Sequence, residues 1–239
     1  MKAKEQRKIL VTGGSGLLGE EIKKLLPKAK YPGSSIFDIT DFSIVDHFYL
    51  VGYFETCIHC AAFASPSGVE KDPMKGLEVN IIGTCNIVRL CKKLNIKLIY
   101  ISTDYVFKGD TGGGYKEDED LNPVNKYAWS KLGGEAAVRL YDNSLIIRLS
   151  FGPNEFPYDK AFSNQYTSRV TVKEAAEQIV EVVEKDIFGV IHLGHASRTV
   201  YSYAKDTSLF KKIEPASRLD VDFKVPRDTS LNIEKYNNL

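Results

Sequence analysis

The stretch of residues 8–19, KILVTGGSGLLG, decides the fold of this chain. It begins with a short run of branched apolar residues that predicts a strand, and its glycine turn leads into a helical pattern at residues 20–26. The glycines allow a tight turn and a close approach of the backbone, and the start of a helix offers unpaired N–H groups and a positive dipole to a pyrophosphate. Glycine turns also occur as purely structural devices, but this position between a strand and a helix favours dinucleotide binding.

The composition predicts one soluble globular domain, with a small appendage. The chain has 239 residues, of which 43% are hydrophobic and 26% charged, so it can bury a sizeable core. A formal net charge of +1 gives no electrostatic footprint for nucleic acid or an anionic membrane. The polar N-terminus lacks the apolar core of a signal peptide, and no later apolar run approaches membrane length. We therefore expect a cytoplasmic protein without a nucleic-acid or membrane partner.

The four cysteines are expected to be free thiols, as in other proteins of reducing compartments. Residues 57–60, CIHC, superficially resemble a metal clip. In a strand, however, Cys57 and His59 point to one side and Cys60 to the other, and no second pair of ligands follows. We expect a buried strand end here and no metal site.

Apolar strands and amphipathic helices alternate along the first 150 residues. This alternation predicts right-handed crossovers and an α/β fold, a Rossmann-type doubly wound parallel sheet whose ligands bind at the carboxyl ends of its strands. The expected strands are residues 8–12, 36–38, 56–59, 97–102 and 145–149; the expected helices are residues 20–26, a helix capped by Thr40 or Asp41 that ends near Leu50, residues 74–94, and a helix that carries Tyr127 and Lys131 to about Tyr141.

The segment after the first helix bears on the choice of cofactor. Residues 28–35, KAKYPGSS, are short and broken by proline and glycine, and they lack the acidic residue that usually reads the adenosine ribose. Lys28, Lys30 and Tyr31 can accept a 2′-phosphate, although a solvated basic turn explains them equally well. The sequence therefore favours NADPH over NADH only weakly, and NADH stays open.

Residues 102–131 carry the candidate chemistry. The strand before them delivers Thr103 and Tyr105 to the same sheet edge as the glycine turn. Tyr127 and Lys131 are one helical turn apart, and a nearby cation lowers the phenol pKa from about 10 toward neutrality, where the phenol can exchange a proton. The spacing alone is weak evidence, because solvated helix faces often show it.

Two further features are expected at this edge. Ala61 and Ala62 follow a strand, at a place where larger side chains would block a flat cofactor. Asn80 lies inside a helical pattern, so we expect it to bond a backbone group near the active site, with simple exposure as the alternative. Residues 108–123 form a polar, glycine-rich loop that we expect to be a solvated flap.

The pattern changes beyond residue 150. A long loop is followed by an expected helix at residues 173–183, a strand at residues 190–193 and a helix at residues 201–209. A second complete strand–helix alternation is missing. We therefore divide the chain into a dinucleotide-binding domain, residues 1–150, and a small C-terminal substrate-binding lobe, residues 151–239, partly interleaved with the sheet.

In the order and spacing of six motifs, the chain resembles the extended short-chain dehydrogenases/reductases, and most closely their dTDP-4-dehydrorhamnose reductase group. The resemblance covers nearly the whole chain, and residues 226–231, PRDTSL, resemble a variant of that group's closing segment. The six motifs are residues 12–19 (TGGSGLLG), 37–41 (FDITD), 58–62 (IHCAA), 79–83 (VNIIG), 102–107 (STDYVF) and 122–135 (NPVNKYAWSKLGGE).

This resemblance implies an NADP(H)-dependent oxidoreductase that transfers a hydride to a 4-keto-6-deoxy nucleotide sugar. Tyr127 would protonate the developing alkoxide, Lys131 would lower the phenol pKa and hold the cofactor ribose, and Thr103 would bond the carbonyl oxygen. Relatives also pair the helices that begin near Met74 and Tyr127, so we expect a homodimer. The remaining implied contacts are Gly13, Gly16, Leu17 and Leu18 with the pyrophosphate, Asp38 and Ile39 with the adenine, Ala61, Ala62 and Ser102 with the inner half of the cofactor, and Tyr105 and Phe151 with the sugar.

Neighbouring functions within the superfamily remain as alternatives. Sugar-nucleotide dehydratases resemble Thr-Asp-Glu where this chain has Thr103, Asp104 and Tyr105, so the second carboxyl is absent and dehydration is disfavoured. Another nucleotide-sugar reductase or epimerase stays open. The regulatory beta subunit of methionine adenosyltransferase also resembles the group, which leaves a non-catalytic dinucleotide-binding protein as the contrasting hypothesis.

Overall fold

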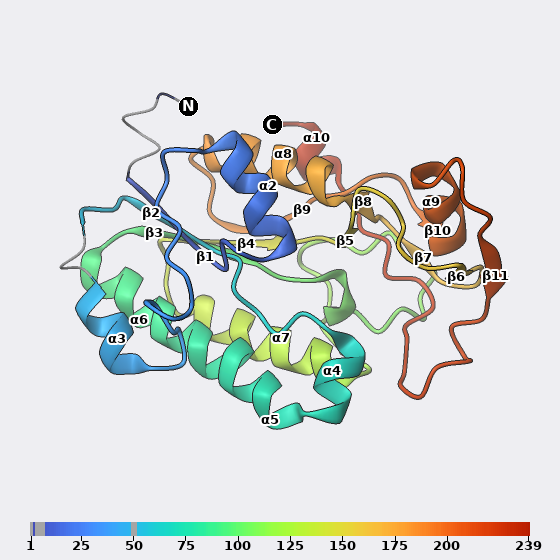
Figure 1. The fold of residues 1–239 in the computed structure, drawn as a ribbon, viewed down its shortest axis with the longest axis horizontal. Coiled ribbons are helices and arrows are strands. Elements are labelled where there is room, and N and C mark those ends of the chain that lie inside the picture. The colour runs from blue at the N-terminus through green and yellow to red at the C-terminus, as the bar shows by residue number, and fades with distance from the viewer. Residues whose placement is uncertain (1, 3–7, 49–51) are drawn as a thin grey trace.

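In this computed structural model, which describes residue 2, residues 8–48 and residues 52–239, a five-stranded sheet forms the centre of the protein (Figure 1). Every pair of neighbouring strands is parallel. The strand order is β1-β2-β3-β4-β9, so the crossovers run steadily outward from β1. The bounds are β1 (Ile9–Thr12), β2 (Thr56–His59), β3 (Lys97–Ile101), β4 (Ser144–Arg148) and β9 (Gly189–His192).

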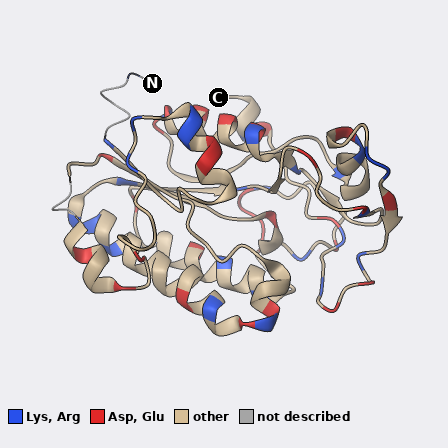
Figure 2. Ribbon diagram, in the orientation of Figure 1, with Lys and Arg blue, Asp and Glu red and all other residues tan. Residues whose placement is uncertain are grey.

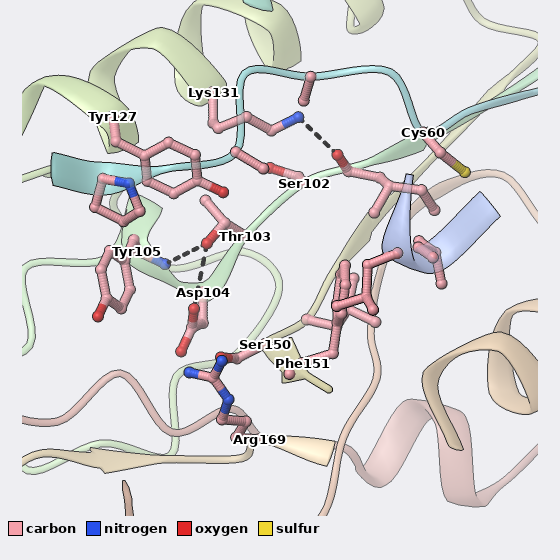
Figure 3. A pocket seen from close by; sticks show the side chains of 18 of the residues that line it. Cys60, Ser102, Thr103, Asp104, Tyr105, Tyr127, Lys131, Ser150, Phe151 and Arg169 are labelled. Atoms are coloured by element: carbon pink, nitrogen blue, oxygen red, sulfur yellow. Dashed lines mark hydrogen bonds between the residues drawn. The ribbon is translucent and has the colours of Figure 1, made fainter. Parts of the chain in front are cut away.

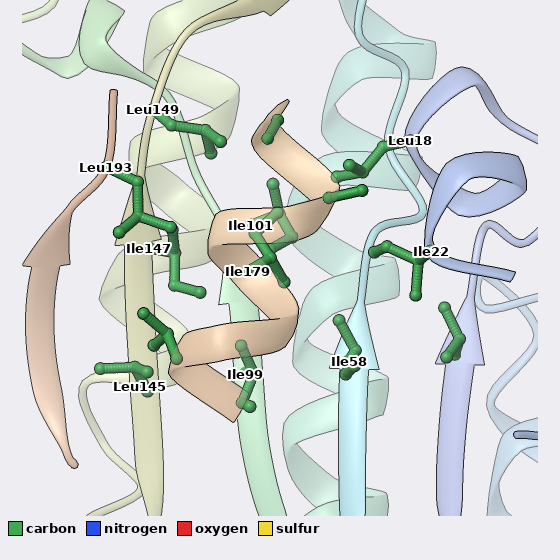
Figure 4. Close-up of a cluster of buried hydrophobic side chains, with 14 of the residues drawn as sticks. Leu18, Ile22, Ile58, Ile99, Ile101, Leu145, Ile147, Leu149, Ile179 and Leu193 are labelled. Atoms are coloured by element: carbon green, nitrogen blue, oxygen red, sulfur yellow. The ribbon is translucent and has the colours of Figure 1, made fainter. Parts of the chain in front are cut away.

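Helices cover both faces of this sheet, which confirms the predicted α/β, Rossmann-type fold (Figure 1). On one face, α2 (Leu17–Leu25) and α8 (Val172–Val183) bury a core that includes Ile22, Ile147 and Ile179 (Figure 4). The opposite face is covered by α3 (Phe42–His47), α6 (Gly83–Leu94) and α7 (Lys126–Val138), over a second core that includes Leu10, Ile87, Leu98 and Tyr100.

The expected strand at residues 36–38 is wrong. Its backbone forms turns instead, in which Asp38 Oδ1 accepts hydrogen bonds from the N–H and hydroxyl of Thr40 at 2.9 and 2.8 Å. Phe37 and Ile39 are buried against the second core, so their alternation reflects packing and not a pleat. Within the described residues, the outer side of β1 carries only an isolated bridge from Leu10 to Lys30. The sheet therefore keeps the doubly wound order, but on the outer side of β1 a single bridge stands in place of a strand.

The helix expected at residues 74–94 is present but contains a π-helical turn. It runs through α5 (Pro73–Gly76), η2 (Leu77–Ile82) and α6 without interruption, and it ends at Asn95 in the left-handed conformation, with φ of 54°. A further short helix, α4 (Pro66–Lys71), precedes it. Asp41 caps α3 as expected, while the predicted helix end near Leu50 lies outside the described residues.

Beyond β4 the chain leaves the sheet, returns through α8 and β9, and leaves it again. The excursions form three small strand pairs, β5–β8, β7–β10 and β6–β11, beside α9 (Val200–Thr207) at one end of the molecule (Figure 1). Phe156, Tyr203 and Ile213 form a separate core there. The remaining bounds are β5 (Phe151–Gly152), β6 (Lys160–Phe162), β7 (Tyr166–Thr167), β8 (Val170–Thr171), β10 (Arg198–Thr199), β11 (Glu214–Ala216), η3 (Asp104–Val106) and α10 (Glu234–Asn237).

The polar loop at residues 108–123 is docked and not a fully solvated flap. The ring of Tyr115 stacks on Phe107 with centroids 4.3 Å apart, and its hydroxyl accepts a hydrogen bond from Gly109 N at 2.9 Å. Tyr115 also bridges to Leu231 near the end of the chain. Basic and acidic residues are interspersed over both helical layers (Figure 2). In the described part of the chain, no helix combines the length and the apolar character that a membrane crossing requires.

Candidate functional site

A cavity of about 380 Å³ lies where the carboxyl ends of the strands meet the C-terminal excursions. It brings together most of the predicted site residues, namely Gly13, Gly16, Leu17, Leu18, Ala62, Ser102, Thr103, Tyr105, Tyr127, Lys131 and Phe151. Three predicted residues are not part of its lining. Asp38 is exposed, Ile39 is buried in the second core, and the N–H of Ala61 bonds Thr12 Oγ1 at 3.2 Å.

The glycine turn has the shape that a pyrophosphate requires. Gly13 has φ of 69°, and an ideal Cβ on it would lie 2.6 Å from Ala61 N, so only glycine fits. Gly16 is the N-cap of α2, and no side chain caps the first N–H groups of this helix. The N–H of Gly16 donates to Gly13 O at 3.0 Å. These residues fit a dinucleotide phosphate by backbone groups alone.

The CIHC segment is a buried strand end, as predicted. His59 Nδ1 contacts Thr12 Oγ1 at 2.7 Å and its Nε2 contacts Thr84 Oγ1 at 3.1 Å. Burial, aided by the charge of Lys131, lowers the pKa of His59 to about 3, so the ring is neutral. Cys60 lines the cavity, but burial raises its pKa to about 12. The described residues include no cluster of side chains able to hold a metal ion.

Helix α7 presents Tyr127 and Lys131 to the cavity (Figure 3). The helix starts at a side-chain cap, in which Asn125 Oδ1 accepts a hydrogen bond from Ala128 N at 2.8 Å. Lys131 Nζ donates to Ile101 O at 2.8 Å and lies 4.2 Å from the centroid of the Tyr100 ring. Burial lowers the pKa of Lys131 to about 7, although the Glu135 carboxylate opposes this shift.

The environment of the Tyr127 phenol differs from the one expected. Burial raises its pKa above the ordinary value, and the groups that act in the opposite direction are the Thr103 hydroxyl and the Arg169 guanidinium. The ring packs edge-on against Tyr105, with centroids 6.3 Å apart. At neutral pH the phenol therefore holds its proton. The expected influence of Lys131 on the phenol stays a prediction.

Thr103 is held by its neighbours on η3 (Figure 3). Its Oγ1 donates to Asp104 Oδ1 at 3.3 Å and accepts from Tyr105 N at 3.2 Å. Asp104 Oδ2 also accepts hydrogen bonds from Thr167 at 3.1 Å and Thr229 at 2.7 Å. Burial raises the pKa of Asp104 to about 6, against the effect of these hydroxyls. The carboxyl thus ties the end of β3 to β7 and to the closing segment.

Asn80 bonds backbone groups beside the cavity, which confirms that prediction. Its Oδ1 accepts from Phe63 N at 2.7 Å, and its Nδ2 donates to Phe63 O at 3.2 Å and to Ser130 Oγ at 2.8 Å. Ser130 in turn donates to Tyr127 O at 2.7 Å. The π-helical turn therefore places one amide between the loop after β2 and the first turn of α7.

A buried ion pair supports the floor of the site and was not predicted. Ser102 Oγ donates to Glu135 Oε1 at 2.5 Å, and Arg148 Nη2 lies 2.9 Å from Glu135 Oε2, with both charged side chains fully buried. Arg148 Nη1 also donates to Glu117 O at 3.2 Å. Such a pair is costly to break because either charge alone would remain buried. It joins the docked loop to the cavity floor.

Sequence reasoning missed several lining residues from the C-terminal part of the chain. Gln165 Nε2 donates to the Tyr105 hydroxyl at 2.7 Å, and Thr167 and Arg169 also line the cavity. Their polar, unpatterned segment offered no local signal. The only available pointer was the closing segment at residues 226–231, whose Thr229 reaches Asp104.

Comparison with known proteins agrees with this geometry. The sequence model of the family described as RmlD substrate binding domain matches residues 7–183. The dTDP-4-dehydrorhamnose reductase of Streptomyces griseus is 31% identical over 186 residues, 73% of this chain and 58% of that protein. Methionine adenosyltransferase 2 subunit beta of Bos taurus is 32% identical over 143 residues, 55% of this chain and 42% of that protein.

A structural relative extends the match to nearly the whole chain. The crystal structure of dTDP-4-dehydrorhamnose reductase from Bacillus anthracis in complex with NADP has a TM-score of 0.86, at 24% identity, over 96% of this chain and 90% of that one. This likeness concerns the fold. The chain spans about half the length of the first curated relatives it matches. With the family match over residues 7–183, the chain belongs to the RmlD substrate binding domain family, the group that its six motifs predicted.

Proposed function

We propose that this protein reduces the keto group of a 4-keto-6-deoxy nucleotide sugar with NADPH. The observation that carries the proposal is that the glycine turn, Thr103, Tyr127 and Lys131 line the same cavity. A dinucleotide site and a proton donor are the two parts that such a reduction needs. The similarity to the dTDP-4-dehydrorhamnose reductase of Streptomyces griseus supports the same class of substrate.

The residues of this chain divide the work of binding the cofactor. The N–H groups at the start of α2 and the Gly13 turn hold the pyrophosphate, and Ala62 leaves room for the inner half. Ser102 and Lys131 lie at the cavity floor, where the cofactor ribose is expected. Contacts of Asp38 and Ile39 with the adenine remain part of the proposal, although neither residue lines the cavity.

NADP is the proposed cofactor form. The Bacillus anthracis relative was crystallised with NADP. In this chain no carboxylate occupies residues 28–35, and a 2′-phosphate would meet Lys28 and Lys30 there. Calorimetric titration with NADPH and NADH tests this choice, and equal or tighter binding of NADH would contradict it.

The chemical step places three side chains around the keto group. When bound, NADPH supplies the hydride that reaches the keto carbon. Tyr127, whose burial keeps it protonated at neutral pH, gives its proton to the developing alkoxide. Thr103 bonds the carbonyl oxygen and Lys131 positions the cofactor ribose, while Tyr105 and Phe151 face the sugar.

Oxidation of NADPH with a panel of 4-keto nucleotide sugars tests the reaction. We expect turnover with at least one member of the panel by the wild-type protein. A second candidate function is a non-catalytic, dinucleotide-binding regulatory protein, because the chain is similar to methionine adenosyltransferase 2 subunit beta. Tight NADPH binding without reduction of any keto sugar would favour that second function.

A further inference from the structure

Arg169 lies in the wall of the cavity and has no part in the steps above. It and Lys131 are the two basic residues of the lining. Among the described residues no carboxylate lies within ion-pair distance of Arg169, and its Nε is buried without a hydrogen-bond partner. A guanidinium is always charged and all its N–H groups are donors, so an unpaired buried Nε is costly. An anionic ligand would remove that cost.

The guanidinium is held in place from two sides. Arg169 directly precedes β8, which pairs with β5, and an ideal Cβ on Gly152 of β5 would lie only 2.8 Å from Arg169 Nη2. On another side the guanidinium carbon lies 5.6 Å from the centroid of the Tyr203 ring. Glycine at position 152 therefore leaves the space that the guanidinium occupies. A cation fixed in this way loses little freedom when it binds a ligand.

The charge of Arg169 acts on the reaction centre. It lowers the pKa of Tyr127, Tyr105 and Asp104, in each case against the larger effect of burial. In Figure 3 the guanidinium reaches up toward Asp104 from the side opposite Lys131. Asp104 already accepts hydrogen bonds from Thr167 and Thr229, so it is committed to the protein scaffold. The two cations thus approach the cavity from opposite walls.

We propose that Arg169 binds a phosphate oxygen of the substrate's diphosphate while the sugar lies against Tyr127. This inference rests on the proposed function. The glycine turn is the anion site for the cofactor, and Lys131 Nζ is committed to Ile101 O, so Arg169 is the cation of the lining that remains for the substrate. The planar fork of a guanidinium matches phosphate oxygens and forms strong, charge-assisted hydrogen bonds.

Arg198 provides a matched control. Its guanidinium lies on the same Tyr203 ring, 5.0 Å from the centroid, and its Nε is also buried without a partner. In contrast to Arg169, it pairs with Asp206 at 2.9 Å and does not line the cavity, and its Nη2 donates to Arg169 O at 3.2 Å. The variants Arg169→Gln and Arg198→Gln therefore both remove a cation from Tyr203, but only the first removes one from the cavity.

The test is calorimetric titration of NADP⁺-saturated protein with thymidine diphosphate and, separately, with thymidine. For Arg169→Gln we expect thymidine diphosphate to bind about 10- to 100-fold more weakly, the effect of losing a charge-assisted hydrogen bond, with thymidine and NADP⁺ affinities unchanged. Arg169→Lys, which keeps the charge but loses the fork, should fall between. Arg198→Gln should bind like the wild type.

Unchanged binding of thymidine diphosphate to Arg169→Gln would overturn the inference, as would its failure to bind the wild-type protein. An equal loss in Arg198→Gln would also overturn it, because packing on Tyr203, together with the bond from Arg198 Nη2 to Arg169 O, would then be the cause. The proposed reduction is judged separately, by turnover of the keto-sugar panel. If the wild type reduces a keto sugar while Arg169→Gln binds thymidine diphosphate normally, the reaction stands and the role of Arg169 fails.

Discussion

At the scale of single residues, the Tyr127 hydroxyl is the group whose removal should stop the proposed reaction. Tyr127 is half-buried, and its raised pKa keeps the hydroxyl protonated at neutral pH. General acid catalysis contributes roughly 10²- to 10⁴-fold, so we expect Tyr127→Phe to lose at least that much turnover of the keto sugar. NADP⁺ affinity should stay almost unchanged because the glycine turn is intact. Steady-state kinetics and calorimetry measure the two quantities.

Thr103→Val provides the comparison for this variant. It removes one hydrogen bond to the carbonyl oxygen and leaves the proton donor in place, so its loss of turnover should be smaller. The order of the two effects matters more than their size. Most of the turnover surviving in Tyr127→Phe would mean that the proton comes from another group or from water.

The lowered pKa of Lys131 leads to a prediction about stability. Burial lowers the pKa of its ammonium from 10.5 to about 7, so between these values the unfolded chain binds the proton and the folded chain does not. The cost of burying the charge is complete below about pH 7 and disappears as the pH rises to the ordinary pKa. Each pKa unit is worth about 1.4 kcal/mol. We therefore expect Lys131→Met to gain stability relative to wild type, most near about pH 6 and progressively less toward about pH 10.

Urea unfolding of both proteins across this pH range checks the prediction. Titrating groups that Lys131 does not affect are shared by the two proteins and cancel in the difference, and His59 and Cys60, which its charge does affect, have pKa values of about 3 and about 12, outside this range. Loss of the hydrogen bond from Lys131 to Ile101 O adds a constant that does not vary with pH. A difference that stayed flat with pH, or grew as the pH rose, would contradict the assigned cause.

Local sequence predicted those residues whose position follows from one element. Gly13 and Gly16 sit where a strand turns into a helix, and Tyr127 and Lys131 follow from a single helical turn. Arg169 had no such pattern. Its place depends on β8 pairing with β5, a contact of the folded chain that no local propensity encodes.

At the scale of elements, the π-helical turn η2 makes Asn80 a link between two segments of the site. Asn80→Ala would leave Phe63 N and O without their partner and free the Ser130 hydroxyl. Buried groups left unpaired cost about 1–3 kcal/mol each, so stability should fall by at least that amount. Because Ser130 bonds the backbone of Tyr127, turnover should fall as well.

Asn86 is a suitable control for this substitution. It is also buried, and its Nδ2 donates to Ile39 O at 2.9 Å, but it lies on α6 and contacts no part of α7 in the bonds described. Asn86→Ala should therefore lose comparable stability and keep its turnover at saturating NADPH, under conditions where both variants are folded. Equal losses of turnover in Asn80→Ala and Asn86→Ala would mean that Asn80 contributes to stability alone. Chemical unfolding and steady-state kinetics separate the two outcomes.

Periodicity located most elements because the sheet is buried on both faces. The segment at residues 56–59 matches β2, and the helical pattern at residues 74–94 covers α5, η2 and α6. It could not reveal the π-helical turn, since one extra residue in a turn leaves apolar spacing almost unchanged. The expected strand at residues 36–38 is wrong because the Asx turn of Asp38 competes with the pleat.

At the scale of the whole molecule, the cavity closes only when distant parts of the chain meet. Asp104, at the end of β3, accepts hydrogen bonds from Thr167 of β7 and from Thr229 near the end of the chain. The backbone N–H of Leu231 also donates a hydrogen bond to Ser168 Oγ at 2.9 Å. These contacts explain why the lining could be predicted on the Rossmann side, whereas on the side of the C-terminal excursions only Phe151 was predicted among the lining residues.

The outer face of the α5–α7 layer leads to the last prediction, a homodimer. Helix α7 packs against α5 and η2 (Figure 1), and together they leave Met74, Leu77, Ile82 and Trp129 between 39% and 59% exposed. Exposed apolar side chains on neighbouring helices are typical of an interface, and a two-fold axis lets the same surface cover itself. We expect light scattering to give a dimer for the wild type and a monomer for the Leu77→Glu/Trp129→Glu variant, since charges buried at an interface without partners are strongly unfavourable.

Phe210→Glu is the control for the dimer prediction. Phe210 is equally apolar and fully exposed but lies in the C-terminal excursion, so this variant should remain dimeric. A wild-type monomer at high concentration would refute the dimer, and a Phe210→Glu monomer would move the interface to the other end of the molecule.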